Sequence, residues 1–318
     1  MTDRPSGGDD LAPIAMFTYN RLAHTRAAIE ALAKNELAAL SKLIIYSDGP
    51  KNESDAAIVE EVRNYLRKVT GFRNIEIRCR PANRGLAQSI ITGVSEVVNR
   101  FGRVIVMEDD LVSSPYYLTY MNDALTLYAH CDDVICIHGY CPPITASLPQ
   151  TFFLRGADCW GWGTWKRGWD LFESDGTKLL SELERRKLLH EFDLNGAYGY
   201  AAMLREQIAG RNDSWAVRWH ASAFLQEKLT LHPRQSLIQN IGFDGSGRHC
   251  GASQERQAKP STERVLIERQ PLTECAAASR AFEAYYRGES PTLWMRLYKA
   301  AKKVGAYTPL RHLLPGRT

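Results

Sequence analysis

The chain has 318 residues, of which 44% are hydrophobic and 24% charged, a composition typical of globular proteins. Its formal net charge of +4 is too small to indicate a nucleic-acid partner. No stretch approaches 18 consecutive apolar residues, and the polar first ten residues lack the apolar segment of a signal peptide. We therefore expect a cytoplasmic protein, in which the seven cysteines are reduced thiols. The spacing of these cysteines fits no common zinc pattern.

Strand and helix patterns alternate through the first third of the chain. Short apolar runs predict strands at residues 11–17, 42–46, 75–79 and 103–107. Helical composition or periodicity predicts helices at residues 22–34 and 54–69 and in the segment that Gly85 opens. This alternation predicts an α/β fold with a Rossmann-like, mostly parallel central sheet and helices on both faces.

The pattern changes after residue 114. There we expect helices at 115–130 and 214–228, short strands at 133–138 and 151–154, and a polar, Gly-rich loop at 236–252. Between them, residues 158–169 hold four of the seven tryptophans. These are expected to be core residues, with Trp160 or Trp162 as an alternative platform for a sugar ring.

Polar residues follow each of the first four predicted strands: Asn20-Arg21, Asp48, Asn83-Arg84 and Glu108-Asp109-Asp110. In sheets of this kind, ligands bind beyond the carboxyl ends of the strands. Three successive carboxylates repel each other, and a divalent cation would relieve that repulsion. Mg²⁺ or Mn²⁺ takes one or two protein carboxylates and fills its other positions with water and phosphate oxygens. Such a cation neutralises the charge that develops on a departing diphosphate.

Alternation along an extended chain predicts that Glu108 and Asp110 point one way and Asp109 the other. The segment 104–112, Val-Ile-Val-Met-Glu-Asp-Asp-Leu-Val, resembles a stretch of N-acetylglucosaminyltransferase I and its bacterial relatives. Residues 14–21 and 46–49 resemble the first two strand ends of that family. The resemblance covers roughly residues 12–250. It implies a GT-A fold with a smaller acceptor-side region, and inverting transfer of a sugar from a UDP-sugar with Mn²⁺ or Mg²⁺.

The resemblance also implies a role for each residue of the donor site. Asp110 would bind the metal, Asp109 would hold the ribose or a metal-bound water, and Glu108 would orient the loop. Arg21 would contact the base or ribose, and Asp48 would accept a hydrogen bond from the uracil N–H group. The remaining expected donor contacts are Thr18, Tyr19, Asn20, Arg84, Arg248 and His249, the last two for phosphate or metal.

An inverting transferase needs a carboxylate that takes the proton from the attacking hydroxyl. Residues 155–162, Arg-Gly-Ala-Asp-Cys-Trp-Gly-Trp, resemble the family segment that carries this base, which makes Asp158 the first candidate. This segment lacks the family's proline, so Asp213, before a predicted helix, is the alternative. Asp213 also has the simpler interpretation of a helix N-cap.

We expect a disordered leader at residues 1–10 and one glycosyltransferase domain at 11–255, made of a nucleotide-binding half (11–113) and an acceptor half (114–255). Residues 256–318 would form a helical extension. Its end, 291–318, has apolar residues at helical spacing with cations beside them. This pattern fits an interfacial helix on anionic lipid or a helix packed on the domain.

The sequence therefore predicts a metal-dependent glycosyltransferase. Its acceptor would be a glycan or glycolipid of bacterial surface polysaccharide or lipopolysaccharide synthesis, at the inner face of the plasma membrane. The turn after the first predicted strand contains no glycine. This argues against Rossmann methyltransferases and dehydrogenases, and against the nucleotidyltransferases that also use metal carboxylates, because these enzymes have a glycine-rich turn or loop there. The alternatives are another nucleotide-sugar enzyme and a non-catalytic sugar-binding module. The module would bind sugar without metal-dependent UDP binding.

Overall fold

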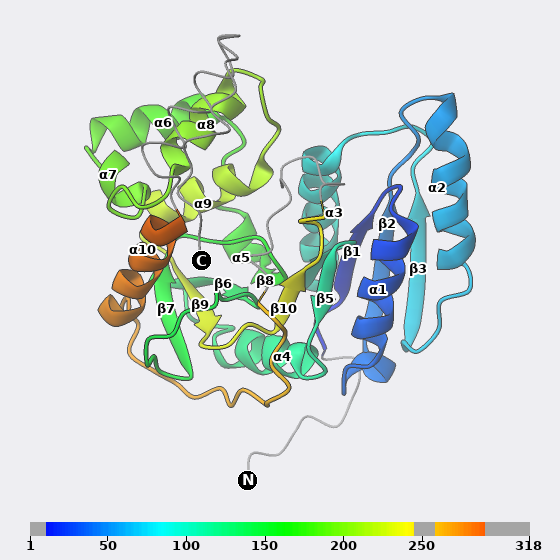
Figure 1. The fold of residues 1–318 in the computed structure, drawn as a ribbon, viewed down its shortest axis with the longest axis horizontal. Helices are drawn as coiled ribbons and strands as arrows, with labels where there is room; N and C mark the ends of the chain where they lie inside the picture. The colour runs from blue at the N-terminus through cyan, green and yellow to red at the C-terminus, as the bar shows by residue number, and fades with distance from the viewer. Residues whose placement is uncertain (1–10, 245–257, 290–318) are drawn as a thin grey trace, which may run out of the picture.

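A computed structural model of the chain describes residues 11–244 and 258–289 (Figure 1). The predicted leader, 1–10, and the tail, 290–318, lie outside the described residues. The described part is an α/β structure built on an eight-stranded sheet with the strand order β3-β2-β1-β4-β8-β6-β9-β7. A separate two-stranded sheet pairs β10 with β5.

The strands are β1 (Ile14–Thr18), β2 (Lys42–Ser47), β3 (Asn74–Cys79), β4 (Arg103–Glu108), β5 (Leu111–Ser113), β6 (Val134–His138), β7 (Thr151–Arg155), β8 (Trp162–Trp165), β9 (Leu229–Pro233) and β10 (Ile238–Asn240). The helices are α1 (Leu22–Ala33), the 3-10 turn η2 (Ala38–Leu40), α2 (Glu53–Leu66), α3 (Leu86–Phe101), α4 (Tyr117–Leu127), α5 (Lys166–Trp169), α6 (Gly176–Arg185), α7 (Leu189–Phe192), α8 (Tyr200–Ile208), α9 (Trp215–Leu225) and α10 (Ala276–Glu289).

Residues 11–113, the predicted nucleotide-binding half, contain a parallel sheet covered on both faces. Strands β1, β2, β3 and β4 are mutually parallel, with β1 in the middle between β2 and β4. Successive residues of β4 alternate between two cores: Ile105 packs on the side of α1 and α4, and Val106 on the side of α3 and α9. A strand that is buried on both faces must be apolar throughout, which is why β4 reads as an uninterrupted Val-Ile-Val-Met run.

The predicted acceptor half continues the same sheet with mixed strand directions. Strand β8 runs antiparallel to both β4 and β6, β9 runs parallel to β6, and the edge strand β7 is antiparallel to β9. Helices α6, α7, α8 and α9 form a further apolar cluster above this part of the sheet (Figure 1).

Helix α10, at the end of the described chain, packs on the edge of the acceptor half. Its buried residues Ala278 and Phe282 contact Phe152 and Leu154 of β7 in one cluster. The N–H of Cys275 donates to the carbonyl of Phe153 at 2.8 Å, just before the helix begins. The first part of the predicted extension is therefore packed on the edge of the eight-stranded sheet.

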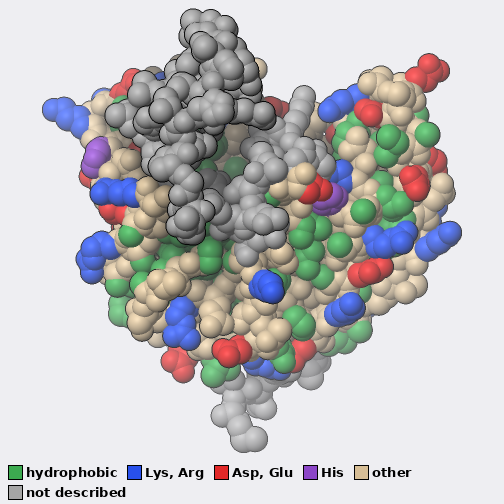
Figure 2. Space-filling model, in the orientation of Figure 1, with side chains coloured by type: hydrophobic (Ala, Val, Ile, Leu, Met, Phe, Trp, Pro, Cys, Tyr) green, Lys and Arg blue, Asp and Glu red, His purple; other side chains and the backbone are tan. Residues whose placement is uncertain are grey.

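The predicted strands and helices of residues 11–138 are present, with ends that differ by a few residues. The sequence did not predict β8, which lies inside the Trp-rich segment, or β9 and the helices α6 and α8. Among the described residues, no helix is long and apolar enough to cross a membrane. On the face shown in Figure 2, positive and negative side chains of the described residues are interspersed.

Candidate active site

The acidic triplet lies where β4 ends. Strand β4 ends at Glu108, and Asp109 and Asp110 form a turn that leads into β5. Arg21, directly before α1, donates from one nitrogen to Asp109 and to Oδ2 of Asp110, the latter at 2.8 Å. The predicted alternation is therefore wrong: both aspartates face Arg21, because the chain is no longer extended after Glu108.

The charges at this corner are only partly balanced. Burial raises the pKa of Glu108 well above its usual range, and the neighbouring Asp110 and Asp109 raise it further. Burial also raises the pKa of Asp109, although Arg21 opposes that shift. Burial opposes the charge on Arg21, but the attraction of Asp109 and Asp110 outweighs it and raises the pKa of Arg21. The single cation Arg21 thus faces three carboxyl groups, so a second positive charge would further reduce their mutual repulsion.

A segment from the far end of the domain also reaches this corner. Strand β10 pairs with β5, and the N–H of Ile241 donates to the carbonyl of Asp110 at 2.8 Å. A Cβ atom on Gly242 would lie 2.4 Å from Oδ2 of Asp110, so a larger residue here would displace the Asp110 carboxylate. Asp244 then pairs with His24 of α1 at 3.1 Å. The predicted contacts Arg248 and His249 lie outside the described residues.

The side chains present at the corner fit a hard cation. Asp110 supplies carboxylate oxygens, the ligand type that Mg²⁺ and Mn²⁺ accept, and its side chain is 16% exposed. No group of three or more His, Cys, Asp or Glu side chains in the described ranges is arranged as a complete metal site. A cation held by Asp110 would therefore take its remaining ligands from water and phosphate, as Mg²⁺ commonly does.

The end of β1 lies beside the triplet. The hydroxyl of Thr18 is buried and has no hydrogen-bond partner in the described structure. Tyr19 donates its hydroxyl to Asp55 of α2 at 2.6 Å; burial and this bond raise the pKa of Tyr19 to about 12. Asn20 follows at the bend before Arg21 and is half-buried. Of these predicted donor contacts, Thr18 therefore has an unused polar group and Tyr19 is already engaged.

Asp48 and Arg84 lie together at the end of β2. The carboxylate of Asp48 is 7% exposed and accepts hydrogen bonds from the backbone N–H groups of Arg84 and Gly85. The side chain of Arg84 is exposed, and no ion pair to it occurs among the described residues. The structure thus brings both predicted donor residues to one place, with the Arg84 guanidinium available.

Asp158 lies in a segment, residues 156–161, that crosses from the end of β7 to the start of β8. One of its oxygens accepts from the N–H of Cys159 at 2.8 Å, and the other lies 3.7 Å from Nδ1 of His138. Its side chain is 34% exposed, so the carboxylate remains accessible.

Two buried histidines stand beside Asp158. Nε2 of His138 accepts from the N–H of Trp160 at 3.1 Å, so the proton of the neutral ring sits on Nδ1. That nitrogen lies 3.3 Å from Nδ1 of His232, which must then accept and carry its own proton on Nε2. Burial lowers the pKa of each ring to about 3, so both are neutral near pH 7.

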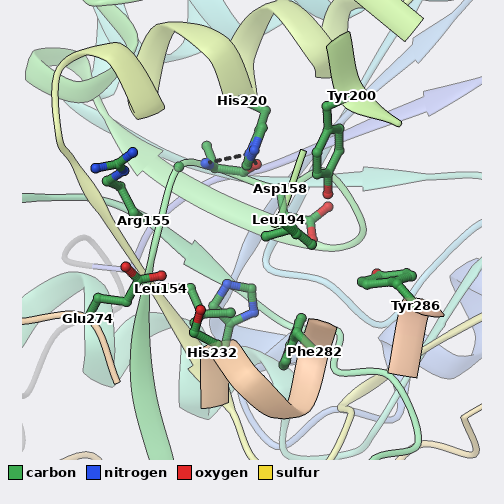
Figure 3. Close-up of a pocket in the computed structure, with 13 residues that line it drawn as sticks. Leu154, Arg155, Asp158, Leu194, Tyr200, His220, His232, Glu274, Phe282 and Tyr286 are labelled. Carbon is green, nitrogen blue, oxygen red and sulfur yellow. Dashed lines mark hydrogen bonds between the residues drawn. The ribbon is translucent and has the colours of Figure 1, made fainter. Parts of the chain in front are cut away.

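A small cavity opens on the other side of Asp158 (Figure 3). His220 and Tyr200 line one side of it, and His232 lies on the other side with Phe282 and Tyr286 of α10. Its volume of about 40 Å³ accommodates water and is too small for a sugar ring. The cavity therefore connects Asp158 to α10 and offers no acceptor site in this conformation.

Asp213 occupies a different position. Ser214, not Asp213, caps α9, because its hydroxyl accepts from the N–H of Val217 at 3.2 Å. The side chain of Asp213 is 63% exposed, and a Cβ atom on Gly85 would lie 3.9 Å from its Oδ2. Asp213 thus faces the turn that carries Arg84, on the donor side. The two candidate bases lie at different walls of the site.

The tryptophans are mainly core residues, as predicted. Trp162 is fully buried and packs against Trp169, Trp215 and Trp219, so the alternative role of Trp162 as a sugar platform is wrong. Trp160 is half-buried and contacts Phe243, whose neighbour Gly242 approaches Asp110.

Sequence analysis missed His138 and His232 as site residues. A signal for the histidines existed, because each follows an apolar run, as the donor residues do: Val-Ile-Cys-Ile before His138 and Leu-Thr-Leu before His232. No local signal pointed to the approach of Gly242 to Asp110, which depends on the pairing of β10 with β5.

The largely parallel sheet with polar residues at its strand ends is an α/β architecture of the GT-A type. Residues 14–144 match the family model described as glycosyl transferase family 2. This part of the chain is therefore a GT-A glycosyltransferase domain, which confirms the predicted fold and enzyme class.

Two crystal structures of S. aureus TarS are similar to the chain. One shares 14% identity over 43% of this chain and 23% of its own, with a TM-score of 0.29. The other, of TarS residues 1–349, shares 9% identity over 71% of this chain and 59% of its own, with a TM-score of 0.37. The chain thus matches less than two thirds of either structure, and a search of curated proteins finds no match.

Proposed function

We propose that the protein transfers a sugar from a UDP-sugar to a hydroxyl group of a glycan or glycolipid, with inversion at the anomeric carbon. The acceptor would belong to bacterial surface polysaccharide or lipopolysaccharide synthesis. The observation that carries the proposal is the acidic corner, where Arg21 and Asp110 meet at the end of β4 inside the glycosyltransferase domain. The choice of uridine, the inversion and the acceptor class rest on the resemblance to N-acetylglucosaminyltransferase I.

The site residues divide into those that would bind the sugar donor and those that would act on the acceptor hydroxyl. Asp110 would hold Mn²⁺ or Mg²⁺, which supplies positive charge against the departing diphosphate. Arg21 keeps Asp109 and Asp110 together, and Arg84 supplies a further cation for phosphate oxygens. Asp158 is the first candidate for the base, because its carboxylate is accessible and the His138 ring lies beside it.

In the proposed reaction, the acceptor oxygen forms a bond to the anomeric carbon as the bond from that carbon to the diphosphate oxygen breaks. The acceptor proton passes to the carboxylate of Asp158, and the electron pair of the broken bond leaves on UDP. Asp213 is the alternative base, because its exposed carboxylate lies beside the Arg84–Gly85 turn.

Calorimetry with UDP, with and without Mn²⁺, tests the proposal. We expect UDP to bind at least about tenfold more tightly with Mn²⁺, because one cation joins Asp110 to the diphosphate. Asp110→Ala should remove the metal dependence. Asp170→Ala is the control, because Asp170 is an exposed carboxylate that pairs with Lys166 on α5. Metal-independent binding of UDP, or unchanged sugar transfer by Asp110→Ala, would sink the metal assignment. Binding of sugars without any binding of UDP would support a sugar-binding module instead.

The membrane assignment concerns residues 291–318, which lie outside the described residues. We propose that their cationic, apolar pattern holds the enzyme at an anionic membrane surface near a lipid-linked acceptor. Deletion of residues 290–318 leaves the packed part of α10 intact and should abolish binding to anionic vesicles. Unchanged vesicle binding would assign this segment a structural role.

A further inference from the structure

The carboxylate of Asp48 is saturated by the protein itself. Its Oδ1 accepts from the N–H groups of Gly49 and Arg84, each at 2.9 Å. Its Oδ2 accepts from Nδ2 of Asn83 at 2.9 Å and from the N–H of Gly85 at 3.0 Å. A carboxylate offers about four acceptor positions, and these four donors fill them. The Asp48 side chain therefore has no free lone pair to offer a nucleotide.

Further contacts around Asp48 also join the end of β2 to the residues that follow Ala82. We call residues Asn83, Arg84 and Gly85 the 83–85 turn. Nδ2 of Asn83 also donates to the carbonyl of Gly49 at 3.0 Å. A Cβ atom on Gly49 would lie 2.4 Å from the backbone of Ala82, so glycine lets the two chain segments touch. The end of β2 is thus fastened to the 83–85 turn from both sides.

A half-buried arginine, Arg63, bonds to the same two segments from the side of α2. Nη2 of Arg63, on α2, donates to the carbonyls of Asp48 and Arg80, at 3.2 and 2.6 Å. Its Nε donates to the hydroxyl of Ser47 at 3.2 Å. These bonds fix the backbone of the two segments that the Asp48 side chain joins, at the end of β2 and at Arg80. The carboxylate is therefore held in one orientation, toward the 83–85 turn.

We infer that Asp48 is a positioning residue: it holds the 83–85 turn against the end of β2 and so presents the Arg84 guanidinium to the diphosphate of the donor. The inference departs from the role that the resemblance implied, in which this carboxylate accepts the uracil N–H. Its donor-binding part rests on the proposed function. Its structural part, the fastening of the turn, does not.

Amide hydrogen exchange tests the structural part without any nucleotide. Asp48→Asn replaces one acceptor oxygen with a donor, so we expect the Arg84 and Gly85 amides to exchange at least about tenfold faster. Glu60→Gln, an exposed carboxylate on α2 that pairs with Arg67, is the matched control and should leave both amides unchanged. Unchanged exchange in Asp48→Asn would overturn the inference. Should Asp48→Asn not fold, Asn83→Ala removes only the two Nδ2 bonds and should show the same effect at smaller size.

Calorimetry with UDP and N3-methyl-UDP tests the base-recognition part. If Asp48 only positions the turn, Asp48→Asn weakens both nucleotides by the same factor, about tenfold. If its carboxylate reads the uracil N–H, methylation weakens binding to the wild type and no longer does so in Asp48→Asn, which would overturn the inference. Arg84→Ala should weaken both nucleotides without faster exchange at Gly85, because the Asp48 bonds to the backbone remain. Failure of the wild type to bind UDP would refute the proposed function. The exchange measurement would then still test whether Asp48 holds the 83–85 turn.

Discussion

The nucleotide-binding half and the acceptor half form their parts of the site in different ways. In residues 11–113, each polar group follows its own strand, and neighbouring parallel strands place these groups at one edge of the sheet. In the acceptor half, Asp158 lies in a connecting segment, and its neighbours His138 and His232 come from strands that are far apart in sequence. The first half thus builds its site by repetition, and the second by contacts between distant segments.

The comparison predicts where single substitutions have the largest effect. In the nucleotide-binding half they should remove activity without loss of the fold, because the charges there repel each other. In the acceptor half they should also affect stability, because polar groups and core residues are packed together. The following predictions test this contrast, from the largest expected effect to the smallest.

Asp110→Ala should lower the rate of sugar transfer by about 10⁴-fold, because the carboxylate that would hold the cation is lost. The melting temperature without metal should not fall, since the substitution removes one of three crowded carboxylates. Transfer assays and thermal unfolding on the same preparation measure both effects. A large fall in melting temperature would mean that the corner stabilises the fold, contrary to the comparison.

Asp158→Asn should lower kcat by about 10³-fold, the usual contribution of a general base. Asp213→Asn should lower it less than about tenfold, because that side chain is exposed at the donor wall. Both variants keep the size of the side chain, so their melting temperatures serve as the control. The opposite pattern, with activity lost only in Asp213→Asn, would move the base to Asp213.

Phe282→Ala should destabilise the domain by about 3–4 kcal/mol, because it removes a buried ring from the contact between α10 and β7. Urea unfolding measures the change. Leu272→Ala, at a side chain that is 41% exposed, is the control and should cost less than about 0.5 kcal/mol. A negligible effect of Phe282→Ala would show that α10 is separable from the acceptor half.

The pair of His138 and His232 should make the protein sensitive to mild acid. Burial lowers the pKa of each ring from 6.5 to about 3, so the unfolded chain binds protons more readily than the folded protein. The contribution to stability is complete above pH 6.5 and is lost as the pH falls from there toward 3. Each ring should cost about 1.4 kcal/mol per pH unit in that range.

Thermal unfolding between pH 7.5 and 5 measures this slope. His232→Phe should make the slope shallower, at the cost of the bond to His138. Equal slopes for the wild type and His232→Phe would mean that His232 does not contribute to the acid sensitivity.

Several features of the fold were predictable because their causes are local. The uninterrupted apolar run of β4, followed at once by Glu108-Asp109-Asp110, gave both the buried strand and the acidic corner. Strand β8 was not predictable, because its residues Trp162–Trp165 mix glycine, threonine and tryptophan and become a strand only by pairing with β4 and β6. The orientation of Asp109 was also missed, since it depends on where β4 ends and on the bond to Arg21.

The sequence by itself determined the alternating α/β architecture and the polar strand ends, because hydrophobic periodicity and strand-end residues are properties of short segments. Only the tertiary structure decided which groups these residues meet. In the tertiary structure, Asp48 accepts hydrogen bonds from the 83–85 turn, Gly242 contacts Asp110, and two buried histidines lie beside Asp158. Each of these contacts joins segments that only the packing of the whole sheet brings together, so no short stretch of sequence contains them.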